Sequence, residues 1–327
     1  MSADLIPVQP NKLSAARAAL VPKLIAAEGE ETTKRFLEFF TVTIRNPNTR
    51  AAYGRAVGYF MDWCHRRRLK LHDIEPMYVA AYIEKLTKER EPQTVKQHLA
   101  AIRMLFDWLV IGQSVKFNPA ASVKGPRYSH KKGKTPILDA EGMRKLLDGV
   151  DTSTVMGLRD RALIALMFYS FGRVSAVVGM DVKDYYPRGK RYFIGLHEKG
   201  GKYHEVPVHH QAEAYLDAYL EAAGIGEQKD TPLFRSSKGK RPDNLSENRM
   251  SRTDAWKMVK RRARQAGIKG DLSPHSFRGT GITVYLEKGG TIEHAQAIAN
   301  HESPRTTKLY DRTGDQISLA EIERIVI

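Results

Sequence analysis

The chain has one cysteine, Cys64, among 327 residues. A disulfide within the chain and a cysteine-based zinc site are therefore excluded. The longest apolar-rich run, residues 162–171, is too short to span a bilayer, and the first twelve residues lack the basic and apolar regions of a signal peptide. Neither common glycine-rich nucleotide-phosphate loop occurs. These absences predict a soluble, intracellular protein that contacts no membrane.

Acidic residues are few relative to basic ones. The chain has 37 Asp and Glu against 53 Lys and Arg, which gives a formal net charge of +16 at pH 7. Hydrophobic residues make up 42%, enough for two globular domains with their own cores. Such an excess of cations predicts a polyanionic partner. Nucleic acid is favoured over a membrane surface, because neither a basic amphipathic helix nor a lipidation signal is present.

Residues 31–123 carry a helical pattern. Apolar side chains recur there at spacings of three and four in three separate stretches. Helices with short connections predict a small bundle, which follows a flexible segment over residues 1–30. The three predicted helices lie within residues 49–67, 73–89 and 93–111.

A basic segment follows the bundle. Residues 124–136 contain five Lys and Arg residues, interrupted by Gly and Pro, and no acid. This composition is typical of a linker between domains. Two interpretations stand: a solvated tether, or a tether that also follows a phosphate backbone.

Residues 137–327 predict a second domain that is mainly helical with a small antiparallel sheet. Asp139 is placed to cap its first helix. Residues 191–197 and 203–209 have strand character and flank a turn with two glycines, which is typical of a hairpin. Helices are predicted over about 158–171, 210–223, 252–266, 276–288, 292–300 and 316–325.

Four short segments of the second domain carry residues suited to phosphate chemistry. They are SFGRVSA, the hairpin tip HEKGGKYHE, LSPHSFRGTG and the stretch IANHESPRTTKLYDRTG. In order they supply Arg173, then Lys199, then His275 with Arg278 three residues later, then His301 with Tyr310 nine residues later.

These residue types point to one chemistry. An arginine fork matches two phosphate oxygens, a second arginine balances charge on an attacked phosphorus, and His275 can exchange a proton near neutral pH. Lys199 can protonate a leaving oxygen. The phenol of Tyr310, with an ordinary pKa of about 10, becomes a nucleophile where cations lower the cost of its phenolate.

Taken singly, each segment has a simpler explanation. An isolated HxxR more often caps a helix, a hairpin lysine is more often solvated, and a lone tyrosine more often packs or lies at the surface. His204, His209 and His210 do not predict a metal site, because no acidic or cysteine partner lies at ligand spacing.

In combination the segments are specific. An arginine, a hairpin lysine, HxxR, a histidine and a tyrosine, in this order near the end of a basic chain, resemble the tyrosine recombinase (lambda-integrase-like) family. The resemblance covers residues 45–327, and TVKQHLAAIRMLFDWLV and NPA look like the domain that precedes the catalytic domain. It implies a helical, SAM-like core-binding domain over 31–123, a basic linker over 124–136 and a catalytic domain over 137–327, closed on DNA as a C-shaped clamp.

The resemblance also implies a role for each matching residue. The two arginines would clamp the scissile phosphate, and His301 would hydrogen-bond to it. Tyr310 would attack the phosphorus, His275 would assist proton transfer, and Lys199 would protonate the departing 5′ oxygen.

The chain departs from the family pattern at two positions. Ala176 stands where the pattern R-x-S/T-E/D has an acid that supports the first arginine, and Asn300 stands where glycine is frequent. At the hairpin, Lys199 is preferred over Lys202 because it comes sooner after the first strand.

The implied reaction uses no cofactor. Attack by Tyr310 would leave a 3′-phosphotyrosine and a free 5′ hydroxyl, and a 5′ hydroxyl from a partner duplex would then attack in turn. The covalent link keeps the bond energy, so neither ATP nor a metal is implied. The family implies a homotetramer on two double-stranded DNA sites that passes through a Holliday junction.

The free chain is expected to be a monomer or dimer, and accessory DNA-bending proteins are further candidate partners. The amphipathic last helix, 316–325, can dock on a neighbouring subunit or on its own domain.

Basic residues outside the catalytic set predict the DNA contacts, mainly to phosphates. The helix over 252–266 carries six cations and no glutamate, and the bundle helix with Gln97 and His98 offers a second face. The predicted DNA-binding residues are Lys96, Arg103, Lys124, Arg127, Lys131, Lys132, Lys202, Arg252, Lys257, Lys260, Arg261 and Arg264.

Three functions fit this chemistry. The favoured one is site-specific recombination, for integration or excision of a mobile element or for resolution of plasmid, transposon or chromosome multimers. The second is a type IB topoisomerase-like enzyme that nicks and closes one duplex. The third is a catalytically impaired DNA-binding accessory protein, for which Ala176 is the support. In each case we expect a cytoplasmic protein associated with the bacterial nucleoid.

Overall fold

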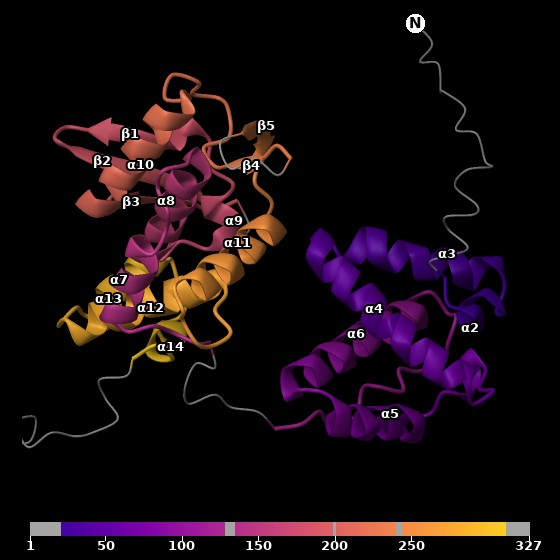
Figure 1. Ribbon diagram of the computed structural model, residues 1–327. Helices are drawn as coiled ribbons and strands as arrows, with labels where there is room; N and C mark the ends of the chain where they lie inside the picture. The colour runs from indigo at the N-terminus through magenta and orange to yellow at the C-terminus, as the bar shows by residue number, and fades with distance from the viewer. Residues whose placement is uncertain (1–20, 128–134, 199–200, 240–243, 312–327) are drawn as a thin grey trace, which may run out of the picture. The chain divides into compact units, whose positions relative to one another are not determined.

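The computed structural model describes residues 21–127, 135–198, 201–239 and 244–311. The chain divides into two units, Met1–Ser129 (unit 1) and His130–Ile327 (unit 2) (Figure 1). The described residues are mainly helical, with small antiparallel sheets, which confirms the predicted fold class. The C-shaped clamp involves both units together and stays a prediction. None of the described helices is long and apolar enough to cross a membrane.

Unit 1 is a helical bundle. Its three long helices each begin with proline, whose missing N–H costs no hydrogen bond at that position. Asn46 caps the first of them by accepting from the amides of Asn48 at 2.9 Å and Thr49 at 3.2 Å. The elements are α2 (Lys23–Ala26), α3 (Glu30–Glu38), the π-helical turn η1 (Phe39–Thr43), α4 (Pro47–His65), the 3-10 turn η2 (Leu71–Asp73), α5 (Pro76–Glu89) and α6 (Pro92–Ile111).

The core of unit 1 follows the apolar spacing of the sequence. Val57, Met61 and Cys64 of α4 are fully buried. Burial raises the pKa of the Cys64 thiol to about 12, so this side chain is a neutral core residue. Leu24 and Ile25 of α2 are buried in the same core. The described part of the segment predicted to be flexible therefore packs onto the bundle.

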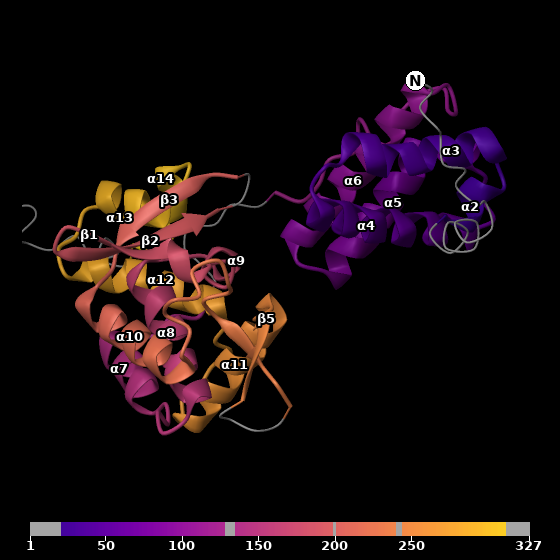
Figure 2. The ribbon, with the colours of Figure 1, turned by 90° about the horizontal axis from the view of Figure 1, so that it is seen from above.

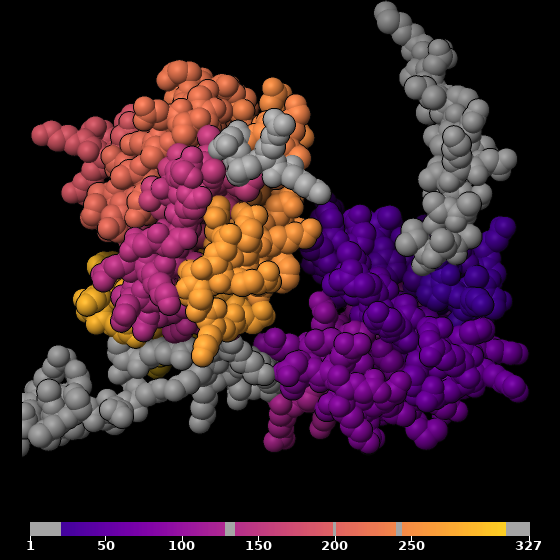
Figure 3. Space-filling model, viewed as in Figure 1, coloured from indigo at the N-terminus to yellow at the C-terminus, as the bar shows by residue number. Residues whose placement is uncertain are grey.

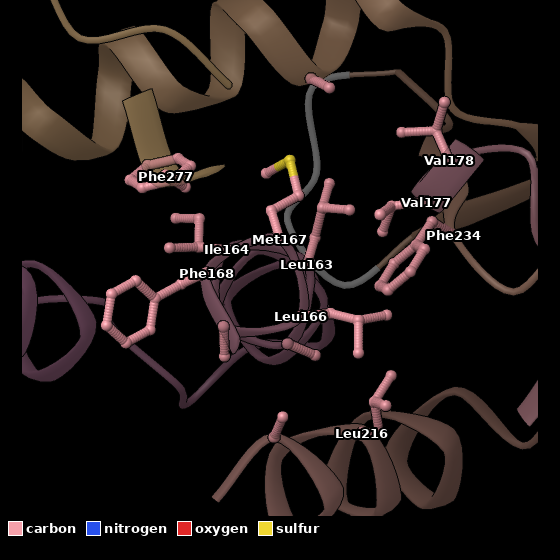
Figure 4. Packing of buried hydrophobic residues seen from close by; sticks show 14 of the residues in the cluster. Leu163, Ile164, Leu166, Met167, Phe168, Val177, Val178, Leu216, Phe234 and Phe277 are labelled. Carbon is pink, nitrogen blue, oxygen red and sulfur yellow. The ribbon is translucent and has the colours of Figure 1, made fainter. Parts of the chain in front are cut away.

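Unit 2 is built around α8 (Val155–Tyr169). From Ala162 on, this helix is apolar on all sides, as expected of a helix in the centre of a core. Figure 4 shows its side chains projecting in every direction, with Phe277 of α12 (Pro274–Glu287) on one side and Leu216 of α10 (His210–Ala223) on another. α8 thereby fixes α12, the helix that carries HSFR.

Two antiparallel sheets complete unit 2. β1 (Tyr185–Arg188), β2 (Arg191–His197) and β3 (Tyr203–Pro207) pair in that order (Figure 2). Ile194 in the central strand pairs with Tyr185 and Val206, and all three are buried. The predicted hairpin is therefore confirmed as β2 and β3, whereas β1 was not predicted. A second sheet, β4 (Arg235–Ser237) with β5 (Leu245–Arg249), was also not predicted.

The other helices of unit 2 frame the candidate site. Asp139 caps α7 by accepting from the Gly142 amide at 2.7 Å, as predicted. α11 lies at the surface of unit 2, within the orange area of Figure 3. The helix predicted at 316–325 lies outside the described residues. The remaining elements are α7 (Ala140–Asp148), α9 (Val174–Val177), the 3-10 turn η3 (Val182–Asp184), α11 (Arg252–Gln265), α13 (Ile292–Ala299) and α14 (Pro304–Lys308).

Candidate active site

Five of the six residues predicted to be catalytic come together in unit 2. They lie on the α8–α9 connection, at the start of α12, after α13 and after α14, and short contacts and mutual electrostatic effects join them. The sixth, Lys199, lies outside the described residues. We call the five the basic pocket: Arg173, His275, Arg278, His301 and Tyr310.

Arg278 forms the floor of the basic pocket. Its side chain is 1% exposed. Nη1 donates to the Phe171 carbonyl and Nη2 to the Ala299 carbonyl, the latter at 2.6 Å, while Nε is buried without a partner among the described residues. Desolvation and the nearby Arg173 lower the pKa of Arg278 to about 10, so it still carries its charge at neutral pH.

The two carbonyls that bind Arg278 lie at places where the backbone adopts an unusual conformation. Phe171 has φ of 52° and Asn300, just after Ala299, has φ of 48°, both in the left-handed region. Asn300 ends α13, and asparagine tolerates this conformation better than most residues, which explains how it can replace glycine. A Cβ at Gly281 would lie 2.2 Å from the Phe168 carbonyl oxygen, so glycine lets α12 approach the end of α8.

Arg173 is the N-cap of α9, and its side chain is 36% exposed. Its Nη1 donates to Oε2 of Glu198, which follows β2 and has a side chain only 3% exposed. Ala176, at the position where the family pattern has an acid, is buried. Sequence reasoning missed Glu198, although a signal existed: it is an acid at the strand end beside the predicted Lys199.

Tyr310 points into the basic pocket of its own chain. Its side chain is 7% exposed, and its hydroxyl lies 2.9 Å from Nε2 of His275. Thr283 of α12 fixes the backbone by donating to the Tyr310 carbonyl at 2.9 Å. A Cβ at Gly279 would lie 3.0 Å from Cε1 of the tyrosine ring, so α12 leaves room for that ring.

His301 lies beside the tyrosine. The two rings are nearly parallel, with centroids 6.3 Å apart. Nδ1 of His301 is 2.9 Å from Oγ1 of Thr307, which leaves Nε2 for a ligand. Desolvation, followed by the two arginines, lowers the pKa of His301 to about 3. This histidine is therefore a neutral hydrogen-bonding group at physiological pH.

Burial dominates the proton affinities around the phenol. Desolvation raises the pKa of Tyr310, although Arg278 and Arg173 act to lower it. Desolvation, Arg278 and Arg173 all lower the pKa of His275, so it is neutral at neutral pH and can accept the phenolic hydrogen on Nε2. As expected, the two cations act to lower the pKa of the phenol, but in the DNA-free chain desolvation raises it by more.

The hairpin end is tied to the loop that carries His301. Lys202 pairs with Glu302 at 2.7 Å, and both side chains are exposed. His204 of β3 lies 3.0 Å from the Ile298 carbonyl of α13 through Nε2. The choice between Lys199 and Lys202 as the acid stays a prediction.

The cations predicted to bind DNA on α11 fall into two groups. Arg252, Lys257 and Arg264 are exposed. Lys260 has a side chain only 20% exposed and pairs with Asp271. The acids that bind Lys260, Arg261 and Arg262 come from outside the helix.

Asp160 of α8 binds the other cations of α11. It is fully buried, and its carboxylate accepts from Nη2 of Arg261 at 2.6 Å and Nε of Arg262 at 2.9 Å. Arg159 donates to the same carboxylate at 2.6 Å and to the Arg235 carbonyl at 2.8 Å. We call Arg159, Asp160, Arg261 and Arg262 the Asp160 cluster. Its arrangement indicates that Arg261 holds α11 on α8 and retains only part of its guanidinium for DNA.

The predicted DNA-binding residues near the linker are exposed where the structure describes them. Lys96 of α6, Lys124 and Arg127 all face solvent. Lys131 and Lys132 lie outside the described residues. These cations stay candidates for phosphate contacts.

Two other residues of the predicted face of α6 are engaged within unit 1. Arg103 donates from Nε to the Ala120 carbonyl at 3.0 Å and from Nη2 to the Val123 carbonyl, so it holds the chain that follows α6. His98 is buried, and its Nδ1 lies 3.1 Å from the Tyr82 hydroxyl. Their positions indicate a structural role for both side chains.

The basic pocket has the groups needed to bind an anion and to move a proton. Two guanidinium groups, one of them with a buried N–H left over, suit phosphate oxygens. The phenol and a neutral imidazole are already at hydrogen-bond distance. No three His, Cys, Asp or Glu side chains in the described ranges are grouped as a metal site requires.

Comparisons with known proteins agree on one family. Residues 136–316 match the Phage integrase family, and residues 33–113 match its N-terminal SAM-like domain. Tyrosine recombinase XerD of Chlorobaculum tepidum is 29% identical over 290 residues, 86% of this chain and 91% of that protein. Tyrosine recombinase XerC of Escherichia coli O127:H6 is 30% identical over 213 residues, 65% of this chain and 67% of that protein.

Solved structures share the fold. A XerH site-specific recombinase bound to a palindromic difH substrate, in a post-cleavage complex, matches with a TM-score of 0.66 at 17% identity, over 95% of this chain and 92% of that chain. A lambda integrase dimer bound to a COC′ core site matches with a TM-score of 0.64 at 18% identity, over 88% of this chain and 79% of that chain. The likeness confirms the fold, and the family matches give the order of its parts as a SAM-like unit followed by a Phage integrase unit.

Proposed function

The chain belongs to the phage integrase family of tyrosine recombinases, and we propose that it recombines DNA through a 3′-phosphotyrosine intermediate on Tyr310. One observation carries this mechanism: the Tyr310 hydroxyl lies 2.9 Å from a neutral His275, in a pocket with two arginines. A phenol next to a proton acceptor and two cations has what attack on a phosphodiester requires.

In the cleavage step, Tyr310 Oη forms a bond to phosphorus as the bond from phosphorus to the 5′ oxygen breaks. The phenolic proton passes to Nε2 of His275, which is neutral at working pH. Arg173 and Arg278 stabilise the charge that develops on the non-bridging oxygens. A bound phosphate adds negative charge to the site. Its oxygens accept hydrogen bonds from both guanidinium groups, which offset that charge.

The remaining proton transfers complete the cycle. Lys199 protonates the departing 5′ oxygen, a role that rests on the family resemblance alone. His301, held through Nδ1 by Thr307, donates to the phosphate through Nε2. A 5′ hydroxyl of the partner duplex then attacks phosphorus and gives its proton back to Lys199. The bond from phosphorus to Tyr310 breaks, and the phenol recovers its proton from His275. The steps balance without ATP or another cofactor.

Recombination by this chemistry needs four active sites. We therefore infer a homotetramer on two double-stranded DNA sites, with strands exchanged in pairs through a Holliday junction. One fold relative is a lambda integrase tetramer bound to a Holliday junction, with a TM-score of 0.63. The biological role is integration or excision of a mobile element, or resolution of DNA multimers, and relatives named XerC and XerD do not choose between them for this chain.

DNA contacts outside the basic pocket go mainly to phosphates. The exposed cations among the described residues are the candidates, and they include Lys96, Lys124, Arg127, Arg252, Lys257 and Arg264. Because such contacts carry no sequence information, they set affinity and salt dependence rather than the choice of target.

A suicide substrate tests the proposed chemistry. DNA sites bound by the chain are first mapped by footprinting, and a nick is then placed near the crossover so that the cleaved end diffuses away. The wild-type chain is expected to accumulate a covalent DNA adduct, and Tyr310→Phe is expected to bind the same DNA without forming one. An unchanged adduct in Tyr310→Phe would refute the nucleophile.

The same assay separates the other two functions. A catalytically impaired accessory protein would bind the site and form no adduct even as the wild-type chain. A topoisomerase-like enzyme would form the adduct and relax a supercoiled plasmid as a monomer, without pairing two sites. Holliday junctions from two mapped sites are the product that we expect.

A further inference from the structure

Glu198 brings a carboxylate into the basic pocket from the end of β2. Its side chain is 3% exposed, and Oε2 accepts from Nη1 of Arg173. The hairpin fixes its backbone: the Glu198 amide donates to the Lys202 carbonyl at 2.8 Å, and its carbonyl accepts from the Gly201 amide at 3.3 Å. A carboxylate this deeply buried needs a cationic partner, and Arg173 is that partner.

The pocket has a charge to balance. Arg173 and Arg278 are close enough for Arg173 to lower the pKa of Arg278, whereas Glu198 acts to raise it. Ala176, one turn into α9 from Arg173, is buried and contributes only a methyl group. The negative charge next to the two guanidiniums therefore comes from a strand end and not from α9.

We propose that Glu198 is a positioning residue for Arg173, holding its guanidinium at the phosphate site and supplying the charge that Ala176 cannot. One Nη1 hydrogen is bound to Glu198, and the other N–H groups of the fork remain for phosphate oxygens. The side chain of Arg173 is 36% exposed, so without this carboxylate it is free to turn toward water. This role rests on the proposed function, because that function supplies the phosphate.

The kinetic test compares three substitutions at this position with one outside the pocket. Glu198→Gln keeps the shape and removes the charge, Glu198→Asp keeps the charge, and Glu198→Ala removes both. The matched control is Glu205→Gln on β3, where the carboxylate pairs with the exposed Arg188 at 2.8 Å. All are assayed for the rate of adduct formation on the nicked substrate at saturating DNA.

We expect Glu198→Gln to slow adduct formation by about 10- to 100-fold, the usual effect of losing a charged hydrogen bond. Glu198→Asp should recover part of that loss, whereas Glu205→Gln should stay within about two-fold of wild type. The affinity for intact DNA should change by less than about three-fold, because Glu198 contacts no DNA. An unchanged rate in Glu198→Gln would overturn the proposal.

A second measurement does not depend on activity. The side-chain NH signals of Arg173 in the DNA-free chain, assigned by their loss in Arg173→Lys, should be slowed in rotation and exchange in wild type and in Glu205→Gln. They should be averaged in Glu198→Gln. Identical signals in Glu198→Gln and wild type would show that the pair does not hold Arg173.

The two measurements also keep the two proposals apart. If the wild-type chain formed no adduct, the proposed function would fail, and the NMR comparison would still decide whether Glu198 holds Arg173. If wild type formed the adduct and Glu198→Gln formed it equally fast, only the role of Glu198 would fail.

Discussion

Two sets of buried arginines in unit 2 make different kinds of contact. In the Asp160 cluster, Arg159 and Arg262 bond to one fully buried carboxylate and to protein atoms around it. In the basic pocket, Arg278 is equally buried, yet two of its donors end on carbonyls and Nε has no partner among the described residues. The arginines of the Asp160 cluster donate to groups of the protein, whereas the basic pocket keeps guanidinium N–H groups available for a ligand.

Structural and functional arginines differ in the groups that surround them. An unpartnered donor alone is not enough, because Nε of Arg161 and of Arg235 is also buried with no partner in the part of the chain that the structure describes. The basic pocket adds a second, half-exposed arginine and a tyrosine that touches a neutral histidine. Spare donors, a proton acceptor and a nucleophile in one place indicate an anion that is to be attacked.

The largest expected effect is on the rate of adduct formation, which should distinguish the arginines of the basic pocket from those of the Asp160 cluster. Arg278→Lys keeps a charge but loses the fork, so adduct formation should fall by about 10³-fold. Arg262→Lys makes the same exchange in the Asp160 cluster and should leave the rate per folded molecule within about three-fold of wild type. Single-turnover cleavage of the nicked substrate measures both, and equal losses in the two variants would erase the distinction.

The next effect separates them by stability. Asp160→Asn leaves three guanidiniums without their carboxylate and should lower the free energy of unfolding of unit 2 by about 3 kcal/mol. Hydrogen exchange with mass spectrometry reads unit 2 by itself. Asp230→Asn, which breaks the exposed pair with Lys183, should leave that free energy unchanged. A wild-type stability for Asp160→Asn would show that the cluster does not hold α11.

A pH effect of intermediate size comes from His301 in the basic pocket. The pKa of His301 is about 3 in the folded chain, against an ordinary value of 6.5. Between these two pH values the unfolded chain therefore binds a proton on His301 that the folded chain does not bind. This stability is fully present above pH 6.5 and is lost as pH falls toward 3. From pH 7.5 to pH 5 the loss is about 2 kcal/mol.

His301→Gln should remove most of that pH dependence, and His294→Gln, exposed on α13, should retain it. The measurement is the free energy of unfolding of unit 2 at both pH values, again by hydrogen exchange. A wild-type slope in His301→Gln would mean that another group, such as His275, carries the effect.

The smallest effect sharpens the comparison on α11. Lys257 is exposed without a side-chain partner among the described residues, whereas Arg261 is bound to Asp160. Lys257→Ala should weaken binding about equally on all DNA sequences and reduce the salt slope by about one, and Arg261→Ala should change the slope less. Titrations at several salt concentrations measure both, and a larger slope change for Arg261→Ala would reverse the assignment.

Local patterns made much of the fold predictable. The spacing in α4 marked Val57, Met61 and Cys64 as core, and Asp139 was identified as a cap from its place before an amphipathic run. The short strands β4 and β5 were missed because three to five residues give too little alternation to recognise. Short elements depend on tertiary contacts that no window of sequence contains.

The residues of the candidate site could be predicted from the sequence, but the groups that those residues contact could not. The order of the motifs identified Arg173, His275, Arg278 and Tyr310 as one set. In the fold these residues lie together in the basic pocket. Arg305 and Lys308, which surround Tyr310 in sequence, face solvent, and the cations that act on its phenol come from far along the chain.

The acids were the least predictable part. Glu198 reaches Arg173 across 25 residues, and Asp160 reaches Arg262 across 102. The sequence of α11 shows six cations and one acid, Asp254, because Asp160 and Asp271, which bind three of those cations, lie outside the helix. Ion pairs over such separations follow from packing, so the sequence can supply the charges without showing which of them meet.

The most direct measurement is the chemical identity of the trapped complex. Wild-type chain is captured on the nicked substrate and digested, and the peptide that carries nucleotide is identified by mass spectrometry. We predict the added mass on Tyr310, a blocked 3′ end and a released 5′ hydroxyl that a polynucleotide kinase can label. Nucleotide on any other residue, or a link to the 5′ end, would contradict the account.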